Sequence, residues 1–122
     1  MEYVLKAIVL LVAIQHLFFL WFEMFAWETF GAKLFKGNSK EYYSKTKSMA
    51  ANQGLYNGFL AAGLIWSLLH ADPYFSQQVA LFFLSCVLIA GIFGAYSVSK
   101  KIFIVQGIPA LIGVLLIVIS NL

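Results

Sequence analysis

The chain has 122 residues, of which 62% are hydrophobic and only 11% are charged. Because a soluble domain is typically about half apolar and a quarter charged, this composition argues against an ordinary soluble protein. Its net charge of +3 fits anionic lipid head groups and needs no nucleic-acid partner.

The apolar residues fall in four blocks, each close to the roughly 20 residues that a bilayer-spanning helix needs. Stretches such as "LIGVLLIVI" are apolar all round, whereas each helix of a soluble bundle would carry a polar stripe. The length allows one domain. We therefore predict a single integral membrane domain over residues 1–122, an all-α bundle of four transmembrane helices at residues 3–27, 50–70, 75–98 and 101–122.

The first predicted helix carries three polar side chains within "QHLFFLWFE", namely Gln15, His16 and Glu23. His16 and Glu23 differ by only about 20° around a helix, so they share a face with Val9 and Val12. A carboxylate in hydrocarbon costs kilocalories unless it is neutralised or paired, and no lysine lies in the same stretch. Ionisable groups inside a membrane are functional-site candidates, so we take Glu23 and His16 as the candidate catalytic acid and base.

The lysines predict which side of the membrane each connection occupies. Five of them lie between the first and second predicted helices, Lys100 and Lys101 lie between the third and fourth, and "HADPY" has none. The positive-inside rule then places both lysine-bearing connections in the cytoplasm and both termini outside. Lys6 is the exception, and its long side chain can reach the outer interface. We expect the second half of the longer connection, residues 28–49, to form a short amphipathic helix in the cytoplasmic interface.

In this orientation every predicted helix places polar side chains in the cytoplasmic half of the bilayer. The second helix opens with "ANQGLYNG", the third ends near "AYS", and the fourth carries a glutamine shortly after it begins. We expect these side chains to form one polar pocket, in which a protonated Glu23 donates a hydrogen bond to Gln53, to Tyr56 or to a ligand carbonyl. The candidate ligand-binding residues are Gln15, Asn52, Gln53, Tyr56, Asn57, Tyr96 and Gln106.

The third and fourth helices also carry packing signals. Pro109 removes one backbone hydrogen bond, so we expect it to kink or open the fourth helix near Gln106. Small residues in a stripe permit close helix packing, and the third helix has such a stripe on its predicted inward face. The stripe consists of Cys86, Ala90, Gly94 and Ser97.

No metal site is predicted, because the Cα atoms of His16 and Glu23 are about 10 Å apart along the helix axis. The single cysteine, Cys86, has no nearby histidine or second cysteine with which to form a metal motif. The sequence carries no Gly-rich phosphate loop and no nucleophile elbow. No motif therefore identifies a cofactor, and the cofactor is unknown.

Three classes of function remain open. The first is a site that binds or converts a small amphiphilic molecule, such as a lipid or quinone-like compound. The second is an oligomeric transporter or channel in which Glu23 couples to protons. The third is a structural or regulatory subunit, because buried amides often only join helices and tyrosines often form an interfacial belt. We favour the first, since a permeation path would also need polar residues in the outer leaflet.

Four stretches resemble a known family: "QHLFFLWFEMFAW", "AANQGLYNGFLAAGL", "AGIFGAYSVSKKI" and "VQGIPA". Together they are similar to the small bacterial membrane proteins of domain of unknown function 1304. The resemblance implies four membrane helices, a place in the bacterial inner membrane as a multi-pass protein, and no assigned activity. The second helix is also similar, more loosely, to the membrane-associated eicosanoid and glutathione metabolism proteins. Those are glutathione-binding trimers, which suggests a homo-oligomer here, but their arginine-rich motif is missing from this arginine-free chain.

Overall fold

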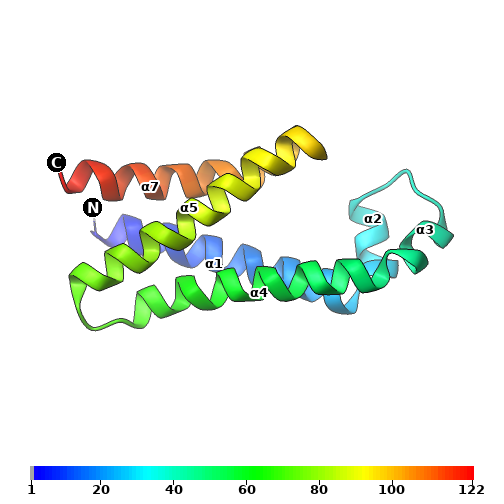
Figure 1. Ribbon diagram of the computed structural model, residues 1–122, viewed down its shortest axis with the longest axis horizontal. Helices are drawn as coiled ribbons and strands as arrows, with labels where there is room; N and C mark the ends of the chain where they lie inside the picture. The colour runs from blue at the N-terminus through cyan, green and yellow to red at the C-terminus, as the bar shows by residue number, and fades with distance from the viewer. Residues whose placement is uncertain (1) are drawn as a thin grey trace. The chain divides into compact units, whose positions relative to one another are not determined.

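The computed structural model describes residues 2–122, and its elements are all helical (Figure 1). Over these residues 88% are in helices and no strand is present. The chain forms two compact units by its internal contacts. One unit comprises residues up to Gln15 together with Leu60–Leu122, and the other comprises His16–Phe59.

α1 (Glu2–Phe25) runs for 24 residues because its sequence is strongly apolar and has no glycine or proline to interrupt it. The side chains of Val9, Val12, His16 and Glu23 are all buried, between 0% and 6% exposed. Their spacing of three, four and seven residues follows one face of a helix. The prediction that His16 and Glu23 share this face is therefore confirmed.

Three helical segments of residues 2–122 are long and apolar enough to cross a membrane, and they indicate a membrane protein. They are Glu2–Phe25, Pro73–Ser97 and Lys100–Ser120. α4 (Lys47–Leu69) has 23 residues, but its first half carries Asn52, Gln53 and Asn57, which make it more polar. α4 corresponds to the second predicted helix, residues 50–70. That this helix also crosses the membrane stays a prediction.

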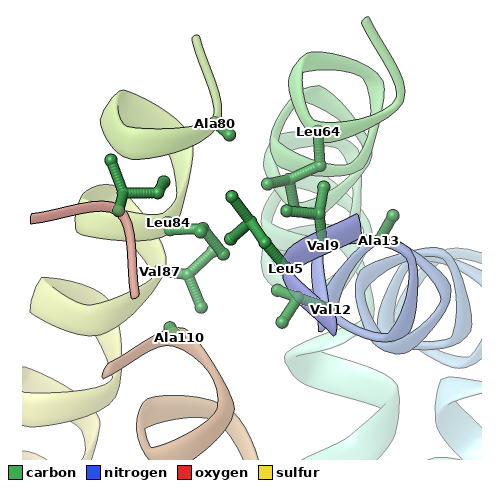
Figure 2. Close-up of a cluster of buried hydrophobic side chains, with 10 residues drawn as sticks. Leu5, Val9, Val12, Ala13, Leu64, Ala80, Leu84, Val87 and Ala110 are labelled. Atoms are coloured by element: carbon green, nitrogen blue, oxygen red, sulfur yellow. The ribbon is translucent and has the colours of Figure 1, made fainter. Parts of the chain in front are cut away.

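The unit that contains residues 60–122 is built around α5 (Pro73–Ser97), whose N-terminus has a cap typical of helix starts. The Asp72 carboxylate accepts hydrogen bonds from the N–H groups of Tyr74 and Phe75 at 2.8 and 3.2 Å. Apolar side chains from α1, α4, α5 and α7 (Ile108–Ser120) pack into one core (Figure 2). That core comprises Leu5, Val9, Val12, Ala13, Leu64, Ala80, Leu84, Val87, Ala110 and Ile117.

The packed face of α5 differs from the predicted one. Its buried residues are Ala80, Leu84, Val87 and Gly91, whereas Cys86 and Gly94 are half-buried and Ala90 and Ser97 are exposed. A Cβ atom added to Gly91 would lie 3.0 Å from the Cα atom of Gly107, so the backbones of α5 and η2 (Phe103–Gly107) almost touch there. Figure 1 shows α5 and α7 as neighbours. The predicted small-residue stripe is therefore only in part the packing face. Gly94 packs closely, since an added Cβ atom would lie 2.8 Å from Ile102 Cγ2, whereas Ala90 and Ser97 are exposed.

The fourth predicted helix is interrupted where Pro109 affects its hydrogen bonds. It begins as α6 (Lys100–Ile102), opens into the π-helical turn η2, and continues as α7. Pro109 has no N–H to donate to the Val105 carbonyl four residues earlier. The Gln15 side chain supplies the missing donor, because its Nε2 atom lies 3.0 Å from the Val105 oxygen. The predicted opening of the helix is confirmed, and a side chain on α1 compensates for it.

This compensation gives a testable coupling between two distant positions. Gln15→Leu is expected to lower the free energy of unfolding by about 1 kcal/mol, because the Val105 carbonyl loses its donor. In a Pro109→Ala background the restored N–H can donate instead, so the same change should cost less than about 0.5 kcal/mol. Thermal unfolding of the four proteins in detergent measures both values. Equal costs in the two backgrounds would contradict this account.

In the other unit, the longer connection between α1 and α4 (Lys47–Leu69) packs on the end of α1, where the Phe35 ring lies beside the rings of Phe22 and Trp27. It contains η1 (Trp27–Gly31), α2 (Ala32–Leu34) and α3 (Lys40–Lys45), so the predicted helix in the second half of the connection is present. The Trp27 ring N–H donates to the Thr46 hydroxyl at 2.9 Å, and the Tyr43 hydroxyl donates to the Phe35 carbonyl. Lys33, Lys36 and Lys40 remain exposed on this segment.

Candidate functional site

The clearest polar cluster joins α1 to the first half of α4 within residues 16–59. The two carboxylate oxygens of Glu23 each accept one hydrogen bond from a different amide. Gln53 Nε2 donates to Oε2 at 2.9 Å, and Asn57 Nδ2 donates to Oε1 at 2.6 Å. Glu23 itself is only 6% exposed, while Gln53 is exposed and Asn57 is half-buried. We call these three residues the Glu23 cluster.

The sequence of α4 explains why these three groups meet. Gln53 and Asn57 are four residues apart, so both point from the same face of the helix. Gly54 lies between them and packs directly against α1. A Cβ atom there would lie 2.8 Å from Met24 Cγ and 3.0 Å from Glu23 Cβ. The absence of a side chain at Gly54 therefore lets α4 come close enough for both amides to reach Glu23.

The electrostatics of the Glu23 cluster are unusual for a carboxylate in an apolar helix. The ion pairs of residues 2–122 join Glu2 to Lys6, Glu41 to Lys45 and Glu28 to Lys47, and none of them includes Glu23. Neutral amide dipoles alone hydrogen-bond to Glu23 in this cluster. The amide oxygens of Gln53 and Asn57 are not used in these bonds and can accept a hydrogen bond from another molecule.

His16, the other candidate catalytic residue, is completely buried on the same face of α1. Its ring packs edge-to-face on Phe19, with the ring centroids 5.1 Å apart. Seven residues separate it from Glu23, which is about 10 Å along the helix axis. A molecule that contacts both groups must therefore extend over about two helical turns.

Gln53 is confirmed as a partner of Glu23, but it donates the hydrogen bond instead of accepting it. Asn57, not Tyr56, is the second partner, and it also donates. Tyr56 is 56% exposed, with its ring beside Phe59, and Asn52 is exposed as well. The neighbouring amide Asn57 was a ligand candidate in the sequence, but its bond to Glu23 depends on the register of α4 against α1.

The remaining candidates lie in the unit that contains residues 60–122. Gln15 bonds to the Val105 carbonyl, while its own Oε1 atom is buried without a hydrogen-bond partner among residues 2–122. Gln106 is half-buried in η2, and Tyr96 is 90% exposed at the end of α5. Tyr96 fits the interfacial belt better than a binding pocket.

Sequence analysis missed a second polar feature in this unit. A cavity of about 440 Å³ is lined by the beginning of α1, the end of α4, the beginning of α5 and the end of α7. Its polar lining includes Glu2, Lys6, His70 and Gln77, which come from two distant parts of the sequence. Each of them lies at the end of a predicted helix, where a polar residue is ordinary, so no local pattern distinguished them.

Comparison with known proteins extends over most of the chain, including the Glu23 cluster. The sequence profile of a family described as "Protein of unknown function (DUF1304)" matches residues 10–118. The chain belongs to this family. One relative of this chain is the "Uncharacterized protein YpaA" of Lactococcus lactis subsp. lactis (strain IL1403). The two are 26% identical over 100 residues, which are 80% of this chain and 82% of that protein. No solved structure matches the chain.

Proposed function

We propose that this chain is a multi-pass protein of the bacterial inner membrane, a single domain of four spanning helices with both termini outside. The exposed lysines of the connection between α1 and α4 support a cytoplasmic position for that connection. α1 then runs inward and α4 runs outward. The Glu23 cluster consequently lies in the cytoplasmic half of the bilayer.

The proposed topology predicts two opposite labelling results in a background without Cys86. A cysteine at Ala71 should react with an impermeant thiol reagent added to intact cells. A cysteine at Lys40 should react only after the cells are permeabilised, because it lies on the lysine-rich side. The reverse accessibility would contradict both the orientation and the assignment of the Glu23 cluster to the inner leaflet.

We further propose that the Glu23 cluster binds the polar group of a small amphiphilic molecule that enters from the membrane. The observation that carries this proposal is the buried Glu23 carboxylate, which is held by two neutral amides and belongs to no ion pair of residues 2–122. A helix contact alone would need no carboxylate, because an amide would join the helices with a smaller desolvation penalty. Glu23 can accept from a hydroxyl or amine, and the Gln53 and Asn57 oxygens add further acceptors.

If the bound molecule is also converted, Glu23 and His16 are the residues that would exchange protons with it. Both side chains are buried on one face of α1, and their separation suits a substrate about 10 Å long. A transporter would use the same carboxylate. The structural alternative is favoured by a different fact, namely that each oxygen of Glu23 already has one amide donor.

Mass spectrometry of extracts from the purified protein tests the binding proposal. The wild-type protein should carry an amphiphile, and Glu23→Gln should carry at least about fivefold less of it, because one hydrogen bond to a charged acceptor is lost. The matched control is Glu28→Gln, since Glu28 is an exposed carboxylate that pairs with Lys47 at 3.2 Å. Unchanged content in folded Glu23→Gln protein would favour the structural alternative.

A further inference from the structure

The cavity near the beginning of α1 has the size and lining of a binding site. Its volume of about 440 Å³ lies within the range of about 300–1,000 Å³ that is typical of small-molecule sites. None of the residues of the Glu23 cluster lines it. A site here is therefore independent of the function proposed for that cluster.

The inner wall of the cavity is apolar. Leu5 and Val9 of α1 and Ala80 of α5 line it and are each at most 8% exposed, and Leu116 of α7 completes this wall. Figure 2 shows Leu5 and Val9 on one side of the packed cluster and Ala80 on the other. The small side chain at position 80 leaves the space open. The buried Ser67 also lines the cavity, but its hydroxyl already donates to the Leu64 carbonyl at 2.6 Å. Such a wall suits a hydrocarbon chain, because it offers mainly apolar contact.

The rim of the cavity carries one negative and one positive charge. The Lys6 ammonium lies 3.3 Å from the Glu2 carboxylate, one helical turn away, and their side chains are 51% and 70% exposed. Both residues line the cavity. An anionic head group would be repelled by Glu2 and a cationic one by Lys6, whereas a zwitterionic head group can pair with both.

Two neutral donors line the same cavity as this charge pair. His70 Nδ1 accepts a hydrogen bond from the Asp72 N–H at 3.1 Å, which leaves Nε2 of the neutral ring to carry the proton. The Gln77 oxygen accepts from Asn121 Nδ2 at 3.1 Å, which orients the Gln77 amide and leaves its NH₂ group to donate. Both side chains line the cavity and can assist Lys6 in binding an anionic group.

We propose that this cavity binds a single-chain amphiphile with a zwitterionic head group, such as a lysophospholipid. The ammonium group pairs with Glu2, the phosphate pairs with Lys6 and accepts from Gln77 and His70, and the chain lies against the apolar wall. The volume of about 440 Å³ lies near the lower end of the range for small-molecule sites, so it suits one hydrocarbon chain rather than two. The head group then lies outside this volume, at the exposed rim that carries Glu2 and Lys6. The rim lies at the ends of segments that can cross a membrane, where a head group reaches water.

Native mass spectrometry of the full chain, released from maltoside micelles, tests this proposal with three probes of equal chain length. They are a lysophosphatidylcholine, a fatty acid and a monoacylglycerol. We expect one lysophosphatidylcholine per chain, bound in preference to the other two. Ala80→Leu should weaken this binding at least about tenfold by filling the cavity, since lost apolar contact and steric overlap both oppose the chain. Ala62→Leu adds the same volume on an exposed face of α4 and should change nothing.

The charge pair supplies a second, milder test that does not disturb the core. Glu2→Gln should weaken lysophosphatidylcholine binding about threefold and strengthen fatty-acid binding, because an exposed charge contributes modestly and repels the carboxylate. Lys6→Gln should weaken both. Equal binding of the three probes, no binding to the wild type, or an unaltered preference in Glu2→Gln would overturn the proposal. So would full binding by folded Ala80→Leu protein. If that variant does not fold, the Glu2→Gln result decides.

Discussion

Glu23→Ala is expected to lower the free energy of unfolding by about 2 kcal/mol, because it leaves two amide donors without their acceptor in an apolar helix contact. Gln53 Nε2 and Asn57 Nδ2 lie 2.9 and 2.6 Å from the Glu23 oxygens. Within residues 2–122, neither amide group donates to any acceptor other than Glu23. Thermal unfolding in detergent, followed by circular dichroism, measures the loss.

Glu23→Gln should cost much less, below about 1 kcal/mol, because the new amide can preserve both hydrogen bonds. Its oxygen accepts from one neighbour, and its NH₂ group donates to the other once that neighbour turns its own amide oxygen inward. Glu28→Ala is the control, since it removes an exposed carboxylate whose ion pair contributes little. Equal losses in Glu23→Ala and Glu23→Gln would show that the charge, not the hydrogen-bond geometry, stabilises this contact.

These two variants together separate stability from function. Glu23→Gln keeps the shape and the helix contact but cannot exchange a proton. A stable Glu23→Gln protein that has lost its bound molecule would support recognition by the carboxylate. A stable protein that keeps it would leave Glu23 as a helix-joining residue, which is the role that buried polar groups often have between membrane helices.

The helices and the buried face of α1 could be predicted because a membrane helix is encoded locally. An uninterrupted apolar run of about 20 residues fixes where such a helix lies, and the predicted span at 3–27 became α1 (Glu2–Phe25). The polar positions His16 and Glu23 fixed its inward face, because an unburied ionisable group in hydrocarbon is costly. Both inferences use only spacing along one helix.

Contacts between helices could not be predicted in the same way. α5 carries small residues on two faces, and the backbones approach each other at Gly91 and Gly107, which lie on the face that was not predicted. The partners of Glu23 depended likewise on the register of α4, which brings Asn57 rather than Tyr56 to the carboxylate. The cavity residues Glu2 and His70 come together only through the packing of several helix ends. The register of one helix against another leaves no local pattern in a single sequence.

The second large effect is expected at Gly54, where α4 packs against α1. Gly54→Ala should lower the free energy of unfolding by about 2 kcal/mol despite the better helix propensity of alanine, because it overpacks this contact. The new Cβ atom would lie 2.8 Å from Met24 Cγ and 3.2 Å from the Leu20 carbonyl oxygen. A backbone oxygen cannot move aside as a side chain can, so the two helices must separate.

Gly58→Ala is the matched control, since it makes the same change one turn later on the same helix. Its Cβ atom would approach Leu20 Cδ1 at 2.6 Å, which is the free end of a flexible side chain. A rotamer change relieves that contact, so the net effect should be within about 1 kcal/mol of zero once the gain in helix propensity is included. Equal destabilisation by both variants would contradict the close backbone approach at Gly54.

The Gly54 variant also has a consequence for the Glu23 cluster. If the helices separate, the amides of Gln53 and Asn57 no longer reach the Glu23 carboxylate. Glu23→Ala should then lower the free energy of unfolding by less than about 0.5 kcal/mol in the Gly54→Ala background, against about 2 kcal/mol in the wild type. The reason is that the effects of substitutions at residues in contact do not add. In the Gly58→Ala background its full cost should remain. Thermal unfolding of these double variants therefore tests whether one missing side chain on α4 permits the hydrogen bonds of the Glu23 cluster.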